Sequence, residues 1–332
     1  MTMQTTRLGG TGLTVSRLCL GTMTFGVQAD EATSRAILDH AFDAGVTFID
    51  TADVYPLGGD TSTVGRTEEI VGRWLQGRRD SVIVATKAVG KVGPQPWQQG
   101  ASRKHLLGAI DASLRRLGTD YVDLYQLHSD DPATPLDETL EALDTIVRSG
   151  RARYVGVSNF LAYRLARLLG RAEARNLARP VSVQPRYSLL FREIERELLP
   201  LAAEDRLGVI PYNPLAGGLL TGKHSLSAGP AQGTRFTLGS AAERYQERYW
   251  HEREFDTVRQ LAAAAADAGV PLTTAAVAWV LANPVVTSAI IGASRPEQLH
   301  DTLRAASFTL DPALKQRFDD ISAEYRRGDA AR

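Results

Sequence analysis

The chain has 332 residues, and its 38 lysines and arginines balance 38 aspartates and glutamates, so the formal net charge is zero. That balance offers no basic surface to a nucleic acid, the 43% of hydrophobic residues argues against a disordered chain, and no uncharged apolar run reaches the roughly 20 residues of a membrane helix. The single cysteine, Cys19, excludes an internal disulfide and favours a reducing compartment, so we expect a cytoplasmic protein that binds neither nucleic acid nor membrane.

Short apolar runs typical of buried strands alternate along the chain with longer segments of helical periodicity. The predicted strands are 17–20, 47–49, 81–86, 121–127, 152–157, 181–184, 208–211 and 287–291. The predicted helices are 31–44, 64–76, 103–117, 136–148, 161–171, 194–203, 255–281 in two pieces, and 296–305. Eight such alternations favour an α/β fold, the (β/α)₈ TIM barrel, over a doubly wound sheet, because the glycine fingerprint of a dinucleotide-binding fold is missing.

A barrel of this kind takes about 250 residues, which leaves a surplus. We assign it to an N-terminal β-hairpin turning at Gly9-Gly10, two long top-face loops (88–101 and 213–240) and a C-terminal helical tail, all within a single domain, 1–332. Both loops follow the carboxyl ends of strands, where barrel enzymes carry their active sites, and loops of this length usually bind or cover ligands. Met23, Phe25 and Trp97 lie on top-face loops and are predicted to line a substrate pocket.

Polar or aromatic residues follow or end six consecutive predicted strands. They are Asp50, Lys87, His128, Ser158 with Asn159, Gln184 and Tyr212. A single residue of this kind is explained by solvation at a strand end, but six that converge on one rim are hard to explain in that way.

Four side chains of this rim suit the donation of a proton to an oxygen. Tyr55, in the loop after Asp50, is a phenol with an ordinary pKa near 10 and is a poor acid–base catalyst at neutral pH. Lys87 would favour the phenolate and lower that pKa, and Asp50 would keep the lysine charged and oriented. His128 would position a carbonyl oxygen beside the Tyr55 hydroxyl. These groups supply half of a carbonyl reduction, and the other half is a hydride source.

Four runs of sequence resemble the aldo-keto reductases: FIDTADVY (48–55), VATK (84–87), DYVDLYQLH (120–128) and GVSNF (156–160). Segments 211–223 and 290–303 continue the resemblance, which covers essentially the whole chain and is closest to the bacterial and potassium-channel β-subunit-like branches. The resemblance implies an NADPH-dependent reductase of aldehydes or ketones whose catalytic tetrad is Asp50, Tyr55, Lys87 and His128, with Tyr55 as general acid. It leaves open an alternative, an NADPH-sensing binding subunit with only incidental turnover.

The resemblance also implies an NADPH/NADP⁺ site along the rim and no metal site. Ser158, Asn159 and Gln184 match residues that hold the nicotinamide carboxamide, and Tyr212 matches an aromatic ring that stacks on the nicotinamide. The residues expected near the phosphates are Asn213, Leu215, Gly217, Leu219, Lys223 and Arg235, and those expected at the adenosine end are Gly292, Ser294, Arg295, Gln298 and Thr302, the last replacing a usual Asn. We further expect Ser294 to cap a helix starting at Pro296, and loop 213–240 to be too glycine-rich to pack as core and to be mobile without NADPH.

Overall fold

The computed structural model describes residues 3–326, and eight parallel strands in it curve into a barrel. The strands are β3 (Leu18–Gly21), β4 (Phe48–Asp50), β5 (Ile83–Ala88), β6 (Val122–Leu127), β7 (Ala152–Ser158), β8 (Ser182–Gln184), β9 (Gly208–Val209) and β10 (Ala289–Ile291). From β3 to β8 each strand pairs with the next in the chain, and β10 pairs with β3. Backbone bonds from Thr287 N to Val209 O (2.8 Å) and from Ile290 N to Pro211 O (2.9 Å) close the ring.

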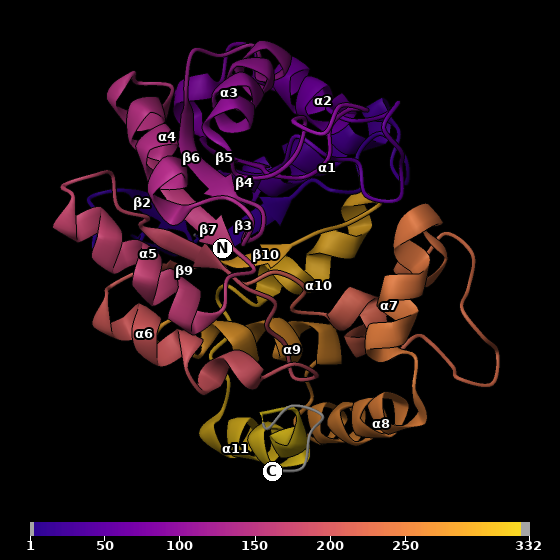
Figure 1. Cartoon of the computed structure of the whole chain (residues 1–332). Coiled ribbons are helices and arrows are strands. Elements are labelled where there is room, and N and C mark those ends of the chain that lie inside the picture. The colour runs from indigo at the N-terminus through magenta and orange to yellow at the C-terminus, as the bar shows by residue number, and fades with distance from the viewer. Residues whose placement is uncertain (1–2, 327–332) are drawn as a thin grey trace.

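Helices surround the strands, as Figure 1 shows. They are α1 (Glu31–Asp43), α2 (Arg66–Leu75), α3 (Arg103–Leu117), α4 (Leu136–Arg148), α5 (Ala162–Ala174), α6 (Leu198–Glu204), α7 (Ala242–Tyr249), α8 (Glu252–Asp267), α9 (Leu272–Leu281), α10 (Leu299–Arg304) and α11 (Pro312–Ile321). The predicted barrel is confirmed, and each predicted strand and helix is present within a few residues of its expected bounds. Helix α7 was not predicted.

Helix α3 illustrates why these segments fold as they do. The Ser102 hydroxyl accepts a hydrogen bond from His105 N at 3.3 Å and caps the first turn. Leu106 and Ile110 recur one turn apart and are completely buried against the barrel. The helix ends at Gly118, whose φ of 64° is in the left-handed region that favours glycine.

Alternation along the strands divides the core into two layers. Cys19, Phe48, Ala85 and Leu124 face the barrel interior, and their chain neighbours face the helices. The predicted hairpin, β1 (Thr5–Arg7) paired with β2 (Thr14–Ser16), adds Leu8 to the interior layer and covers the amino ends of the strands. The interior positions at the opposite, carboxyl ends of the strands are polar, and they form the site described below.

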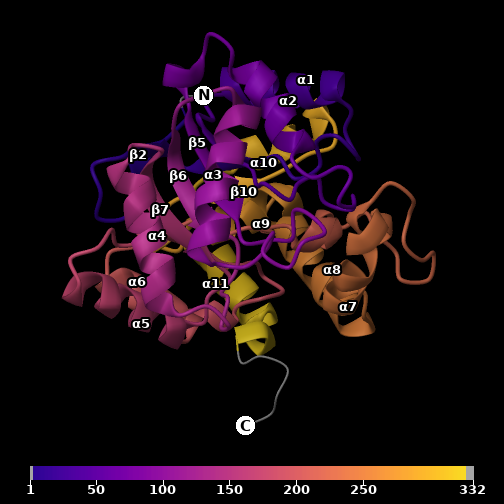
Figure 2. The same cartoon turned by 45° about the horizontal axis from the view of Figure 1, so that its top comes forward.

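The long loop after β9 is more ordered than we expected. It contains a 3₁₀ segment, Ala216–Thr221, and buries Leu219, Leu220 and Phe236 almost completely, so the expectation that it cannot pack as core was wrong. It leads into α7, and Figures 1 and 2 show the loop and this helix together at one edge of the molecule. Among residues 3–326 no single helix is both long and apolar enough to cross a membrane; α8 and α9 meet that test only as a pair bent by 95°.

Candidate active site

Lys87 is the centre of the polar rim. It is completely buried at the end of β5, and its Nζ donates three hydrogen bonds: to Asp50 Oδ1 (2.5 Å), to the Thr51 carbonyl (2.8 Å) and to the Tyr55 hydroxyl oxygen (3.4 Å). The Tyr55 ring meets the His128 ring edge to face, with centroids 5.7 Å apart. The structure therefore brings together the four side chains predicted to work together.

Two glutamines hold the second oxygen of Asp50. Gln126 Nε2 donates to Asp50 Oδ2 at 3.1 Å, and Gln184 Nε2 donates to the same oxygen at 2.8 Å. Gln126 was not predicted, because it lies within β6 rather than after it; its alternation with Leu124 toward the barrel interior is the signal that could have revealed it. Gln184, predicted to face a nicotinamide, is hydrogen-bonded to the tetrad in this structure.

The electrostatics of Lys87 and Tyr55 differ in part from our expectation. Burial alone would lower the pKa of Lys87, but Asp50 and Tyr55 outweigh it, and the net pKa is raised. For Tyr55, burial raises the pKa above its ordinary value, and the opposing effect of Lys87 does not cancel it. Lys87 lowers the pKa of Tyr55, as predicted, but desolvation of the phenolate is the larger effect, so the net pKa is raised.

His128 is held in its neutral form. Burial, then the charge of Lys87, then that of Arg244 lower its pKa to about 3. A neutral imidazole next to a phenol can donate a hydrogen bond to an oxygen held between them.

The residues predicted for a nicotinamide form a connected group on the rim. The Ser158 hydroxyl donates to the Gln184 carbonyl at 2.7 Å, and Asn159 Nδ2 donates to the His128 carbonyl at 2.9 Å. The Tyr212 hydroxyl donates to Asn159 Oδ1 at 2.8 Å. These hydrogen bonds join β6, β7, β8 and the segment after β9 beside the tetrad.

The loop residues predicted near the phosphates serve several structural purposes. Asn213 Oδ1 accepts from Gly217 N at 3.0 Å, and its Nδ2 donates to the Tyr249 hydroxyl at 3.2 Å, which ties the loop to α7. Leu215 is partly buried and Leu219 fully buried against the core, whereas Lys223 is exposed. Arg235 has a buried guanidinium nitrogen, Nη1, with no hydrogen-bond partner among residues 3–326. Burial lowers the pKa of this guanidinium, and the nearby Tyr245 and Tyr55 oppose that effect.

The predicted adenosine end differs in detail from expectation. Ser294 does not cap the turn Pro296–Gln298; instead Gln298 Oε1 accepts from Ser294 N (2.8 Å) and from its hydroxyl (3.2 Å). The prediction that Ser294 caps this helix end and helps to form an anion site was therefore wrong in its geometry. The serine is instead hydrogen-bonded to the Gln298 side chain. Thr302 is buried, and its hydroxyl donates to the Leu299 carbonyl at 2.9 Å. Gly292 and Arg295 are exposed.

The three predicted pocket residues are in unlike surroundings. Phe25 has no exposed surface and lies in the core between the barrel and the helices, so in this structure it does not present its ring to a substrate. Met23 is partly buried, and its carbonyl accepts from Leu57 N at 2.8 Å. Trp97 is half exposed, with the Lys104 ammonium 5.9 Å from its ring.

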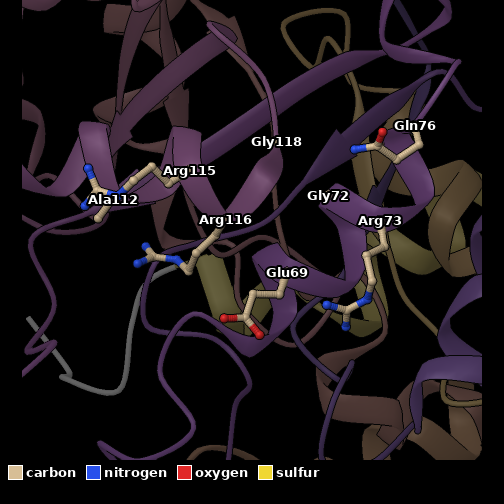
Figure 3. Close-up of a pocket in the computed structure, with 8 residues that line it drawn as sticks. All are labelled: Glu69, Gly72, Arg73, Gln76, Ala112, Arg115, Arg116 and Gly118. Carbon is tan, nitrogen blue, oxygen red and sulfur yellow. The ribbon is translucent and has the colours of Figure 1, made fainter.

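A separate hollow lies on the outside of the barrel between α2 and α3 (Figure 3). Arg73, Arg115, Arg116 and Glu69 line it, and no tetrad residue does. Arg73 and Arg116 are already paired with Glu31 and Glu68.

The fold and the rim define a barrel enzyme whose polar side chains meet at the carboxyl ends of the strands. Residues 17–323 match the model described as the aldo/keto reductase family. The chain is 43% identical over 327 residues to the uncharacterized oxidoreductase YrpG of Bacillus subtilis, 37% identical over 329 residues to a probable voltage-gated potassium channel subunit beta of Arabidopsis thaliana, and 36% identical over 310 residues to the L-glyceraldehyde 3-phosphate reductase of Escherichia coli. These matches cover 96%, 96% and 91% of this chain and 96%, 96% and 87% of the relatives. The chain belongs to the aldo/keto reductase family, and it is an oxidoreductase.

Proposed function

We propose that this oxidoreductase reduces an aldehyde or ketone to an alcohol with NADPH, and that Tyr55 is the general acid. The observation that carries the proposal is the placement of Lys87, which donates to Asp50, Thr51 and Tyr55 at once while buried beside His128. An ion pair with only a structural role would not need a phenol hydrogen-bonded to its ammonium group. A phenol there is suited to a proton transfer that the lysine can support electrostatically.

The rim has features that fit a dinucleotide. Arg235 has a buried guanidinium nitrogen with no partner among residues 3–326, which suits an anion. Gly217 and Gly218 have φ of 71° and 104°, a left-handed backbone conformation that favours glycine and lets a ligand approach the main chain closely. We assign the nicotinamide end to Ser158, Asn159, Gln184 and Tyr212, the phosphates to Asn213, Leu215, Gly217, Leu219, Lys223 and Arg235, and the adenosine end to Gly292, Ser294, Arg295, Gln298 and Thr302. NADPH, when bound, supplies the hydride.

The proton comes from the protein. The raised pKa of Tyr55 keeps its hydroxyl protonated at neutral pH, ready to donate to a carbonyl oxygen that gains negative charge. Lys87 then stabilises the phenolate that remains, and Asp50, held by two glutamines, keeps the ammonium in position. Neutral His128 donates a second hydrogen bond to the same oxygen and so orients the carbonyl.

The change Tyr55→Phe tests the assignment of the acid. It removes the proton donor and little volume, so we expect carbonyl reduction to fall by about 10²–10⁴. Tyr163→Phe on α5, where the side chain is 59% exposed, is the matched control and should keep the wild-type rate. NADPH binding, followed by tryptophan fluorescence, should change by less than about twofold in both. A Tyr55→Phe enzyme with wild-type turnover would falsify the assignment.

The alternative function is that of an NADPH-sensing subunit, and the named similarity to channel β subunits is its support. Turnover separates the two. A panel of sugars, aromatic aldehydes, dicarbonyls and steroids with NADPH should reveal at least one substrate reduced at about 1 s⁻¹ or faster, within the usual range for enzymes. Tight NADPH binding with only very slow oxidation across the panel would favour the sensing subunit.

A further inference from the structure

Helix α7 carries two arginines, Arg244 and Arg248, beside the rim of the barrel. Neither the sequence analysis nor the proposed mechanism assigns them a role. Arg244 and Arg248 lie one turn apart and therefore on the same face of this helix, and Tyr245 is next to Arg244. Neither arginine forms an ion pair with a carboxylate of residues 3–326. Arg244 is exposed and Arg248 is partly buried, so an incoming small molecule can reach both.

Contacts on its inner side fix α7 against the rim. The Tyr249 hydroxyl accepts a hydrogen bond from Asn213 Nδ2 at 3.2 Å, one residue beyond Tyr212. Tyr245 is 4% exposed, with its ring 6.4 Å from that of Phe236. It lies so close to Gly217 that a Cβ there would come within 2.7 Å of the tyrosine ring. The helix is therefore held in one place relative to the tetrad.

The charges of the two arginines act on different residues of the rim. The charge of Arg244 acts on His128, where it adds to burial and Lys87 in lowering the pKa of the imidazole. Arg248 interacts with the Tyr212 hydroxyl, on the side assigned to the nicotinamide. The Tyr212 hydroxyl donates to Asn159, whose amide nitrogen donates to the His128 carbonyl, so both arginines act on one connected group of rim residues. In the proposed mechanism this group lies beside the carbonyl that His128 orients.

We propose that Arg244, assisted by Arg248, binds an anionic group of the substrate, and that the substrates are small aldehydes or ketones with a carboxylate or a phosphate. The inference rests on the proposed function, and it deepens it by naming the substrate class. A guanidinium offers two parallel donors that match the oxygens of a carboxylate or a phosphate. Arg235 remains assigned to the cofactor, since its unpaired nitrogen is buried, whereas Arg244 is open to solvent.

Matched pairs of carbonyl compounds test this inference. Succinate semialdehyde against butanal probes a carboxylate, and glyceraldehyde 3-phosphate against glyceraldehyde probes a phosphate. We expect the wild-type enzyme to prefer the anionic member of at least one pair by tenfold or more in kcat/KM. In Arg244→Gln that preference should fall by about ten- to a hundredfold, mainly through KM, because a charge-assisted hydrogen bond has that effect on affinity. Arg244→Lys should restore part of it.

The controls separate this role from others. Arg259→Gln removes a charge from α8, where the side chain is 76% exposed, and should change neither member of a pair. In Arg244→Gln the neutral substrates and the Kd of NADPH should stay within about twofold of wild type. Equal loss for neutral and anionic substrates, or a comparable loss of NADPH affinity, overturns the inference and leaves the proposed function standing. A wild-type enzyme that reduces no carbonyl overturns both.

Discussion

Burial shifts the pKa of Tyr55 upward and that of His128 downward, and both shifts leave the side chain uncharged at neutral pH. The tetrad thus consists of one buried ion pair, Lys87 with Asp50, beside two neutral hydrogen-bond donors. The ion pair is satisfied on every side, by two glutamines at the carboxylate and by Thr51 and Tyr55 at the ammonium. Such saturation is what allows charge to persist away from water.

The lowered pKa of His128 predicts a specific loss of stability in acid. Between pH 6.5 and about 3 the unfolded chain binds a proton on this histidine and the folded protein does not, so the free energy of unfolding falls as the pH falls. From pH 6.5 to 5 the loss amounts to at most about 2 kcal/mol. Urea denaturation should show a smaller loss over this interval in His128→Gln than in wild type. His40→Gln, at an exposed position of α1, should behave as wild type; if it matched His128→Gln, the effect would not belong to the site.

For Asp53 we expect the opposite dependence of the free energy of unfolding on pH. This carboxyl group is 1% exposed, neither oxygen has a well-formed hydrogen bond to another described residue, and burial together with nearby Glu68 raises its pKa well above the ordinary value. Its contribution to stability is complete below the unfolded pKa near 3.9 and is lost as the pH rises toward the folded value.

The change Asp53→Asn should therefore raise the free energy of unfolding at pH 7, by on the order of 1 kcal/mol, and have little effect near pH 3.5. Thermal or urea denaturation at the two pH values measures it. Asp120→Asn, at an exposed position before β6, should be neutral at both. A stabilisation of Asp53→Asn that did not depend on pH would mean that the carboxyl stays ionised in the fold.

The polar residues that end predicted strands lie together in the structure with Tyr55, but several of their contacts could not be read from the sequence. Gln126 was missed because it sits inside a strand, and Arg244 because its neighbourhood depends on a helix far along the chain. The net rise of the Tyr55 pKa was not predicted, because desolvation cannot be judged before the degree of burial is known. Thr302 illustrates the same limit: only the structure shows its hydroxyl turned to the Leu299 carbonyl.

Among the elements, the eight strands were predictable because each is an apolar run with both faces covered. Helix α7 was not, because its residues are mostly polar and only Tyr245 and Tyr249 are buried. Their spacing of four was the one available signal, and it is a weak one in a helix of eight residues. This helix and the loop before it also show how a glycine-rich segment can still be built into the fold.

Substitution of Gly217 tests whether its contact with Tyr245 fixes the position of α7 relative to the loop. The φ of 71° at Gly217 disfavours other residues, and a Cβ would lie 2.7 Å from the Tyr245 ring. Gly222 is a matched control, since its φ of 72° is equally strained and nothing lies within 4 Å of its Cβ position. Both alanine variants should lose roughly 1–2 kcal/mol of stability from backbone strain.

Only Gly217→Ala should in addition displace α7. We expect it to weaken NADPH binding and to raise the KM for anionic carbonyl substrates, while Gly222→Ala keeps both within about threefold. Fluorescence titration and steady-state kinetics supply the two quantities. Identical behaviour of the variants would show that the Tyr245 contact does not position the helix.

Loop 213–240 connects distant parts of the rim. Gln28 donates to the Gly233 carbonyl, and Ser240 contacts Gly59 in the loop that follows Tyr55. We still expect the loop to exchange faster without NADPH than with it, because Gly222, Lys223 and Gly233 are exposed. Hydrogen exchange should show protection by NADPH across 222–235 and little change in α3. Equal exchange in both states would indicate a preformed site and contradict the expected ordering of the loop by NADPH.

Across the whole molecule, the barrel separates stability at the amino ends of its strands from chemistry at the carboxyl ends. Leu8 shows the first function: it is completely buried in the interior layer beneath the strands and packs against Gly208, where a Cβ would come within 2.5 Å of the leucine. The tetrad shows the second, since its polar side chains take the interior positions that apolar ones fill lower in the barrel.

Leu8→Ala should therefore cost about 2–5 kcal/mol of stability, as removal of a buried leucine usually does, and leave kcat unchanged where the variant is folded. Leu226→Ala, at a loop position that is 39% exposed, is the control and should change the melting temperature little. The measurements are urea denaturation and turnover at a temperature well below both transitions. We expect this result because Leu8 and the tetrad lie at opposite ends of the strands. A cavity at the amino ends should change the positions of side chains at the carboxyl ends very little, since the strands between them are rigid. A large drop in kcat in folded Leu8→Ala would mean that the interior layers move together, and the hairpin would then belong to the machinery that positions Lys87.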